Sequence, residues 1–245
     1  MGDDRGTGCI LHPAALFPPE GSEPEVKGAA GRCVRRSILK IALIMDASQS
    51  GKNADVFEVL KKSAEKYGHT AVNYGQYGPD EPHNVTTVTN SVLSSVVIAS
   101  GAADFVISGC ANGVGASIGM NAMPNLLCGI LNDAADAEQF AEEHCGNSVC
   151  MPFERAFHWG GEAAFGTIFD HLFAKLEPVD AQTSPEIFAL KAASGRSVED
   201  VIRTLEDDLL KQSFGGRGVM DLLRADCRDA ALVEMVEGRL AAMDA

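Results

Sequence analysis

The stretch ADFVISGCANGVGASIGMN, residues 103–121, joins a short apolar run to a loop rich in glycine. The run is typical of a buried strand, and Cys110 follows it directly, ahead of Gly113 and Gly115. Glycines between a strand and a helix leave backbone N–H groups free to approach an anion at the helix N-terminus. Cys110 is therefore either a buried residue in a tight turn or the reactive group of a site.

The same alternation of apolar strand and helical pattern extends over most of the chain. Strands are predicted at 38–46, 70–75, 103–109, 126–132 and 148–153, and helices near 54–68, 85–100, 133–144 and 160–175. This alternation predicts the α/β class: a three-layer αβα Rossmann-like sandwich around a five-stranded parallel sheet, for which we expect the order 2-1-3-4-5.

Two segments of different composition flank this Rossmann-like domain, which we place at residues 37–176. Residues 1–36 are rich in Gly, Pro and charge and predict an irregular N-terminal arm. Residues 177–245 predict a helical C-terminal extension, with helices near 184–193, 197–212 and 228–242.

Composition excludes several classes of function. The chain of 245 residues has a formal net charge of −14, so it lacks the positive field that binding to nucleic acid or an anionic membrane requires. Its seven cysteines are odd in number and contain no Cys-x-x-Cys spacing, which argues against a disulfide framework and a standard zinc site. The most apolar segment is short and contains Lys40, so we expect a cytoplasmic protein with neither secretion nor membrane insertion.

The expected topology brings two reactive groups together. Ligands of open doubly wound sheets bind beyond the carboxyl ends of the strands, where the strand order reverses. With the order above, that crevice lies between the first and third strands, which end at Asp46 and Cys110. A helix N-terminus lowers the pKa of a nearby thiol, and the loop 111–115 offers N–H donors for the developing oxyanion of an enediolate. The arrangement favours proton-transfer chemistry beside a carbonyl.

Cys110-Ala-Asn-Gly-Val-Gly-Ala-Ser-Ile118 resembles the Cys-Gly-Thr-Gly-x-Gly-x-Ser-Ile stretch of the type B ribose-5-phosphate isomerase and galactose-6-phosphate isomerase family. Asp46 ends the first strand as the family's Asp does. The segment EEHCGNSVCMPFER, residues 142–155, resembles the family's helix-to-strand segment, and FGGRG, residues 214–218, resembles its phosphate-gripping Gly-Gly-Arg-His element. The resemblance covers residues 40–176 and this short later element.

The resemblance implies aldose–ketose isomerisation, with ribose 5-phosphate and ribulose 5-phosphate as the leading pair. His144 would open the sugar ring, Cys110 would move a proton between C1 and C2, and Asp46 would hold substrate hydroxyls. The implied substrate-binding residues are Asn112, Gly113, Gly115, Ser117, Cys145, Arg155 and Arg217, the last on the phosphate. The resemblance implies no metal or organic cofactor, and it implies a homodimer or a dimer of dimers, because family sites form between two subunits.

Departures from the family pattern concern the phosphate. Ala47 stands where the family has a phosphate-binding His, and Asp221 stands where it has a second Arg, although Arg224 is near in the sequence. Cys145 replaces an Asn, and His83 could replace lost contacts. The alternative substrate is therefore another phosphorylated or acidic pair, such as a tetrose, a hexose or a uronate.

Other interpretations of these residues stay open. Cys110 could be packing, His144 a helix C-terminal residue, Arg217 part of a turn and Arg155 half of an ion pair. Gly113-Val-Gly115 with Asp133 suggests a dinucleotide site, although Ile118 occupies the third glycine position. A non-catalytic sugar-binding protein is the third possibility.

Overall fold

The computed structural model describes residues 38–176, except 83, 124, 145 and 159, together with residues 221, 224–225 and 229–243. The predicted N-terminal arm and the predicted helices near 184–193 and 197–212 lie outside these residues. None of the helices in the described ranges is long and apolar enough to cross a membrane.

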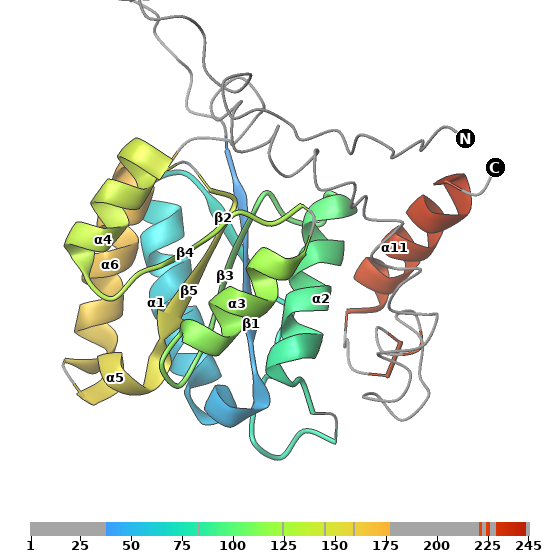
Figure 1. The fold of residues 1–245 in the computed structure, drawn as a ribbon, viewed down its shortest axis with the longest axis horizontal. Helices are drawn as coiled ribbons and strands as arrows, with labels where there is room; N and C mark the ends of the chain where they lie inside the picture. Colours follow the sequence, from blue (N-terminus) through green and yellow to red (C-terminus); the bar gives the residue numbers. More distant parts are fainter. Residues whose placement is uncertain are drawn as a thin grey trace, which may run out of the picture. The chain divides into compact units, whose positions relative to one another are not determined.

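The core is a five-stranded, all-parallel sheet, which confirms the predicted fold class (Figure 1). Its strands are β1 (Lys40–Met45), β2 (Thr70–Asn73), β3 (Phe105–Cys110), β4 (Cys128–Ile130) and β5 (Ser148–Pro152), in the order β2-β1-β3-β5-β4. The predicted order was wrong in its last two strands. All five residues of β5 are buried, as an interior strand requires, whereas the three half-buried residues of β4 suit an edge.

Helices cover both faces of the sheet (Figure 1). Helices α1 (Asn53–Lys66), α4 (Ala134–Gln139) and α6 (Gly161–Lys175) pack on one face, and α2 (Thr87–Ala99) and α3 (Val114–Ala122) pack on the other. Helix α11 (Ala230–Met243) matches the helix predicted near 228–242 and buries Leu232 and Val236 in the α2/α3 core.

The two cores differ in character. On the α1/α6 face, Phe165, Phe169 and Phe173 recur every four residues along α6, and their rings stack at centroid distances of 6.1 and 6.0 Å. The α2/α3 face holds smaller aliphatic side chains together with many buried Ser, Thr and Asn residues of α2. Polar groups are thus buried on the face that carries α2.

Short helical turns connect these elements: two follow the carboxyl ends of strands, and the third leads into the amino end of β5. They are η2 (Ala47–Lys52), a 3₁₀ turn after β1, η3 (Phe140–His144), a π turn that completes the helix predicted over 133–144, and α5 (Phe153–His158) after β5. Helix α4 begins at a cap, because Asp133 Oδ1 accepts the N–H groups of Ala135 and Asp136, both at 2.9 Å.

Candidate active site

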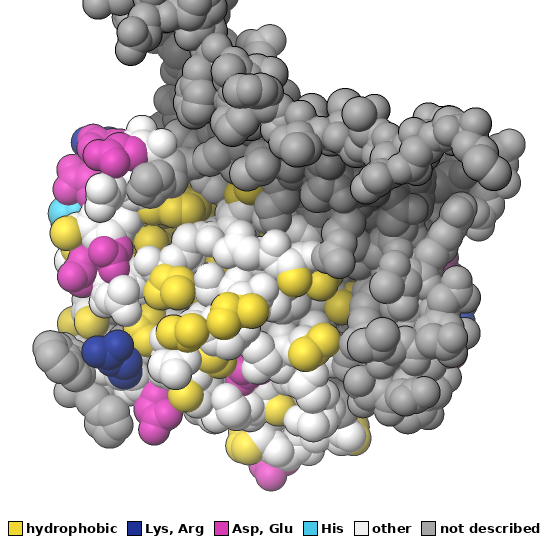
Figure 2. All heavy atoms as spheres, viewed as in Figure 1, with side chains coloured by type: hydrophobic (Ala, Val, Ile, Leu, Met, Phe, Trp, Pro, Cys, Tyr) yellow, Lys and Arg dark blue, Asp and Glu magenta, His cyan; other side chains and the backbone are white. Residues whose placement is uncertain are grey.

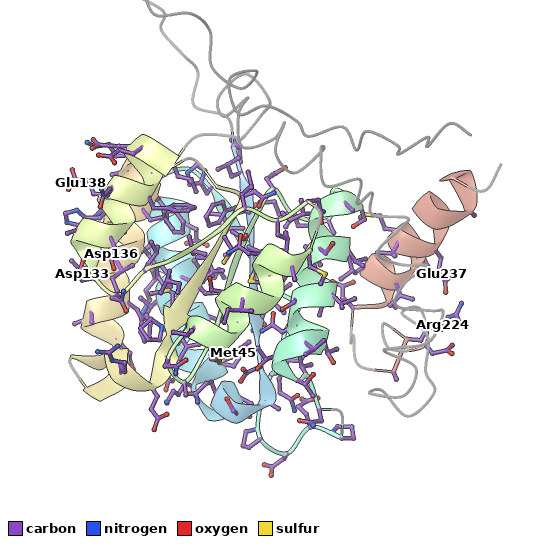
Figure 3. All side chains as sticks on the ribbon, in the orientation of Figure 1. Met45, Asp133, Asp136, Glu138, Arg224 and Glu237 are labelled. Carbon is purple, nitrogen blue, oxygen red and sulfur yellow. The ribbon has the colours of Figure 1, made fainter. Side chains whose placement is uncertain are left out.

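Strand register brings the two predicted reactive residues to the same edge of the sheet. Met45 of β1 pairs with Gly109 of β3, so Asp46 and Cys110 come next at the carboxyl ends of neighbouring strands. Figure 3 marks Met45 on β1, where the chain turns into η2. The expectation that these two strand ends are adjacent is therefore met by the topology.

Cys110 is half-buried and begins the glycine loop. Its thiol donates to Asn112 Oδ1 at 3.6 Å, and the same oxygen accepts the N–H of Val114 at 3.0 Å. Gly113 precedes α3 with a φ of +78°, a left-handed conformation in which a side chain would be strained, and a Cβ there would lie 3.3 Å from the backbone of Met151. Asn112 and Gly113 thus hold the loop between Cys110 and α3.

Asp46 is 2% exposed, and both of its carboxylate oxygens accept hydroxyl hydrogen bonds. Ser48 Oγ donates at 2.6 Å and Thr87 Oγ1 at 3.2 Å. Ser48 is exposed and Thr87 is half-buried, so the buried carboxylate is bound by two residues that themselves reach the protein surface. Sequence reasoning missed these two partners. The Thr86-Thr87 pair ahead of an apolar helix was the available signal, since Thr86 caps α2 through the N–H of Thr89.

A second buried polar group, Asn90 of α2, joins β1 to β3 just below the site. Its Nδ2 donates to the Ile44 carbonyl at 3.1 Å, and its Oδ1 accepts from Ser108 Oγ at 2.9 Å and from Ser94 Oγ at 3.3 Å. Ile44 and Ser108 each lie two residues before the strand-end positions described above. Asn90 therefore fixes the relative position of the two strands that carry the carboxylate and the thiol, and sequence reasoning missed it.

A second sulfur group lies deeper in the sheet. Cys150 is buried, with its Sγ 3.4 Å from Cys128 Sγ and 3.3 Å from Met120 Sδ. The hydrogen bond with Cys128, then burial, then the charges of Cys110 and Asp46 raise the pKa of the Cys150 thiol well above its ordinary value. Cys150 is thus held as a neutral thiol beneath the site.

The remaining predicted site residues are placed as follows. Gly115 is exposed in the first turn of α3, and a Cβ added to it would lie 3.9 Å from Thr87 Cγ2. Ser117 is buried, and its Oγ lies 3.4 Å from Asn121 Nδ2. Arg155 is exposed on α5, directly after β5. His144 ends η3, but its side chain lies outside the described residues, as do His83, Cys145 and Arg217.

Arg224 and Asp133, which the sequence suggested as possible ligand-binding residues, make other contacts in the structure. Asp221 and Arg224 are 3.4 Å apart, and Arg224 also pairs with Glu237 of α11 at 2.8 Å (Figure 3). Asp133 caps α4 and follows β4, the edge strand, which β5 separates from β3. A dinucleotide site would need this carboxylate at the end of the strand beside β3, so the order of strands argues against that alternative.

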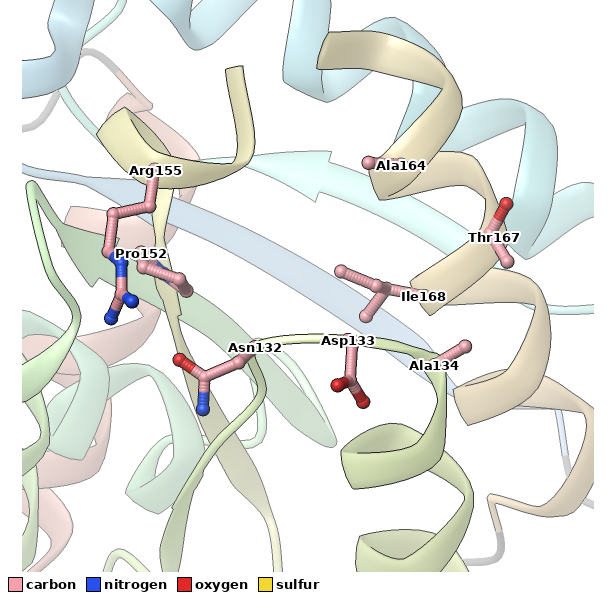
Figure 4. A pocket seen from close by; sticks show the side chains of 8 residues that line it. All are labelled: Asn132, Asp133, Ala134, Pro152, Arg155, Ala164, Thr167 and Ile168. Atoms are coloured by element: carbon pink, nitrogen blue, oxygen red, sulfur yellow. The ribbon is translucent and has the colours of Figure 1, made fainter. Parts of the chain in front are cut away.

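A cavity of about 670 Å³ opens beside the site, at the carboxyl ends of β4 and β5 (Figure 4). It is lined by Asn132, Asp133, Ala134, Pro152, Arg155, Ala164, Thr167 and Ile168. Pro152 is the register partner of Cys110, so the cavity wall and the thiol belong to adjacent strands. The arrangement provides a thiol, a hydroxyl-bound carboxylate and a glycine loop beside a ligand-sized hollow.

Comparisons with known proteins identify the family of the chain. Residues 41–165, just over half of the chain, match the family model Ribose/Galactose Isomerase. A solved 4-deoxy-L-threo-5-hexosulose-uronate ketol-isomerase, complexed with a tartrate, is 30% identical, with a TM-score of 0.66 over 82% of this chain and 99% of that one. A ribose-5-phosphate isomerase from Vibrio parahaemolyticus is 28% identical, with a TM-score of 0.65 and the same coverage.

More distant structures share the fold. The type B ribose 5-phosphate isomerase of Leishmania infantum is 15% identical, with a TM-score of 0.54 over 64% of this chain and 99% of that one. No curated protein sequence is significantly similar to this chain. On the family model and on the similarity at 30% identity, the chain belongs to the Ribose/Galactose Isomerase family.

Proposed function

We propose that this protein is an aldose–ketose isomerase that acts at the carboxyl ends of β1 and β3. The observation that carries the proposal is the half-buried thiol of Cys110 at the start of the glycine loop, one strand away from Asp46. Ketol isomerisation needs one group that moves a proton between neighbouring carbons and fixed donors for the oxygen that becomes negative. The thiol and the first turn of α3 provide these two components.

The reaction follows from these groups. The Cys110 thiolate takes the proton from C2 of the open-chain aldose, the electron pair forms the C1–C2 double bond, and the carbonyl oxygen becomes the enediolate oxygen. The same thiol then returns its proton to C1, and the proton of the C2 hydroxyl passes to the C1 oxygen, so that the C1 oxygen ends as a hydroxyl and the C2 oxygen as the ketone. The N–H groups of Gly115 and Ala116 precede the first α3 hydrogen bond, from Ser117 N–H to Gly113, and can stabilise the oxyanion.

Asp46 acts in this proposal by orienting hydroxyl groups. Ser48 and Thr87 donate to its carboxylate, so their oxygens present lone pairs that can accept hydrogen bonds from substrate hydroxyls. By the family resemblance, His144 opens the sugar ring and Arg217 contacts a phosphate. Asn112, Gly113, Gly115, Ser117, Cys145, Arg155 and His83 complete the proposed substrate-binding set.

Two substrate classes are supported by different observations. Similarity to the Vibrio parahaemolyticus enzyme supports ribose 5-phosphate and ribulose 5-phosphate. Similarity at 30% identity to the hexosulose-uronate ketol-isomerase supports a uronate, as does the replacement of a family phosphate ligand by Ala47. We favour the uronate, because this chain has fewer cationic residues than the family pattern provides for binding a phosphate.

A homodimer is part of the proposal. Val114 and Ile118 of α3 and Val88 of α2 are 48%, 68% and 46% exposed, and Figure 2 shows apolar side chains gathered over α3. Apolar side chains of this size, clustered on neighbouring helices beside a site, are typical of a contact surface. A second copy on this surface would enclose the glycine loop.

The test is hydrogen exchange in deuterated water. The purified protein is incubated with ribose 5-phosphate, hexose phosphates and hexuronates, and deuterium at C1 or C2 is followed by NMR. We expect incorporation by the wild type and a loss of at least about a hundredfold for Cys110→Ser, with Cys128→Ser as the matched control that retains activity. Folded wild-type protein that exchanges no proton in any of these sugars would refute the proposal.

A further inference from the structure

Three sulfur atoms meet in the core between α3 and the sheet, and the proposed reaction uses none of them. Met120 of α3 and Cys150 of β5 are fully buried, and Cys128 of β4 is half-buried. Cys150 Sγ lies 3.3 Å from Met120 Sδ and 3.4 Å from Cys128 Sγ, and Cys128 Sγ lies 3.9 Å from Met120 Sδ. These three residues form a triangle of sulfur atoms that we call the sulfur triad.

The dimensions of the sulfur triad fit a three-coordinate metal ion. An ion at the centre of the triangle would lie about 2.1 Å from each sulfur atom, so movements of about 0.2 Å reach the metal–sulfur distance of about 2.3 Å that thiolate ligands adopt. The long, unbranched side chain of Met120 can move this far without a change of the backbone.

The backbone holds the sulfur triad in place before any ion binds. The carboxamide of Asn121 accepts the N–H of Cys128 at 3.1 Å and donates to its carbonyl at 2.9 Å, which ties β4 to α3 beside Met120. Cys150 lies in β5, an interior strand that is paired on both sides. Ligands that are fixed in advance lose little conformational freedom on binding, which favours affinity.

The same backbone disfavours a disulfide between the two cysteines. Cys128 pairs with Ser148, two residues before Cys150. The Cα atoms of the two cysteines are therefore separated by one strand spacing and by two residues along the strand, roughly 8 Å in total. A disulfide needs Cα atoms within about 7 Å of each other. A metal ion, in contrast, can join the two sulfur atoms without a shift of either strand.

The chemistry of the ligands selects the ion. Two thiols and a thioether are soft ligands, which favour Cu⁺ over hard cations such as Mg²⁺ and Ca²⁺. Structural Zn²⁺ takes four ligands, and in the described part of the chain no group of three or more His, Cys, Asp or Glu side chains could hold a metal ion. Met120 and Cys150 belong to the apolar α2/α3 core, which keeps water away from a bound ion.

We infer that Met120, Cys128 and Cys150 form a binding site for a soft monovalent cation, Cu⁺. The ion enters beside the half-buried Cys128 and joins α3 to β4 and β5. Each cysteine that coordinates as a thiolate releases one proton to solvent, and its electron pair forms the sulfur–copper bond. Copper stays Cu⁺ throughout, so no oxidant or reductant is consumed. The inference is independent of the proposed function, because the sulfur triad contains neither Cys110 nor Asp46.

The test is a competition for Cu⁺ under anaerobic, reducing conditions. The purified protein, freed of metal, is titrated into the coloured complex of Cu⁺ with bicinchoninate, and the loss of colour measures transfer to the protein. We expect one tightly bound Cu⁺ per chain, with a Kd at least about 100-fold weaker for Cys150→Ala and about 10-fold weaker for Met120→Leu. Met151→Leu, which changes a buried methionine of the same strand in the α1/α6 core, is the matched control and should bind as the wild type does.

The outcomes decide the inference. The other cysteines of the chain are present in all of these proteins, so equal Kd values for the wild type and Cys150→Ala overturn it. Far-UV circular dichroism checks folding, and Met120→Leu, which keeps the side-chain volume, decides by the same comparison if Cys150→Ala does not fold. Formation of a disulfide between Cys128 and Cys150 in metal-free protein treated with diamide also overturns it, because the backbone would then bring the two cysteines closer than the structure does.

A second measurement reports the ligands directly. X-ray absorption of the copper-loaded wild type should show three sulfur atoms about 2.3 Å from copper, and nitrogen or oxygen atoms in their place contradict the inference. Cys110→Ser separates this site from the proposed function. The variant should bind Cu⁺ as the wild type does while losing proton exchange. Loss of tight Cu⁺ binding in Cys110→Ser would place the ion at the glycine loop and overturn the inference, whatever the exchange assay shows.

Discussion

Asn90→Ala is a substitution outside the apolar core for which the structure predicts a clear loss of stability. Asn90 is 1% exposed and makes hydrogen bonds with Ile44, Ser94 and Ser108. Each net hydrogen bond stabilises by about 1 kcal/mol, and buried partners left unsatisfied add to the loss. We expect the free energy of unfolding to fall by about 2–3 kcal/mol, which lowers the Tm by roughly 4–12 °C for a chain of this size.

The assay is urea unfolding followed by far-UV circular dichroism, with Asn121→Ala as the matched control. Asn121 also bonds through its side chain to Ser117 and Cys128, but it is exposed, so water can replace these bonds. The control should lose less than about 1 kcal/mol. Equal losses for the two variants would refute the argument, because burial of Asn90 is the reason for the larger effect.

A double-mutant cycle with Ser108→Ala then isolates the contact between α2 and β3. The Asn90 and Ser108 side chains are 2.9 Å apart, and contacting residues in one network show coupling of about 0.5–3 kcal/mol. Additive losses within about 0.3 kcal/mol would show that the two side chains stabilise the fold independently, contrary to the structure.

Two further predictions concern the sheet. Gly109→Ala should lower the free energy of unfolding in urea by about 1–3 kcal/mol, because its Cβ would lie 2.1 Å from the Met151 carbonyl oxygen and 2.8 Å from the Phe153 ring. Gly166→Ala is the control: its Cβ would contact only Val59, at 3.6 Å, so the free energy of unfolding should not fall. Because the pKa of Cys150 is raised, the folded state keeps a proton that the unfolded chain loses above the ordinary thiol pKa of 9.0. The free energy of unfolding should therefore fall as the pH rises above 9. It should fall less in Cys150→Ala, which lacks this thiol. Unfolding measured from pH 8 to 10.5 checks this, and equal slopes for the two proteins would contradict it.

The fold was predictable because its signals are local. Strand and helix periodicities depend on residues close in sequence, and the five strands and the helices between them lie where the patterns predict. The order of β4 and β5 was not predictable in this way. The segments LLCGILN and SVCMPF are similarly apolar, and their positions depend on which strand pairs with β3 along its full length, a non-local competition.

The site was predictable only where topology determines it. Asp46 and Cys110 follow from strand ends, whereas the hydroxyl partner Thr87 is 41 residues from Asp46 and Asn90 is 46 residues from Ile44. Helix α2 did carry a signal: TVTNSVLSSVVIA has no separate polar and apolar faces, and Thr89 to Val97 are all buried. Polar residues in such a helix must find buried partners, so its Ser, Thr and Asn residues were candidates for a network.

The location of this network links stability to the proposed chemistry. On the α1/α6 face, stacked phenylalanines stabilise the sheet through apolar area, which tolerates substitutions of similar volume. On the α2 face, the contacts that stabilise β1 against β3 are directional hydrogen bonds. They involve Ile44 and Ser108, which lie two residues before Asp46 and Cys110. A change of hydrogen-bond geometry there moves the strand ends themselves. Substitutions in the α2 network should therefore alter stability and exchange rate together, whereas substitutions in the stack of Phe165, Phe169 and Phe173, which does not line the cavity, should alter stability alone.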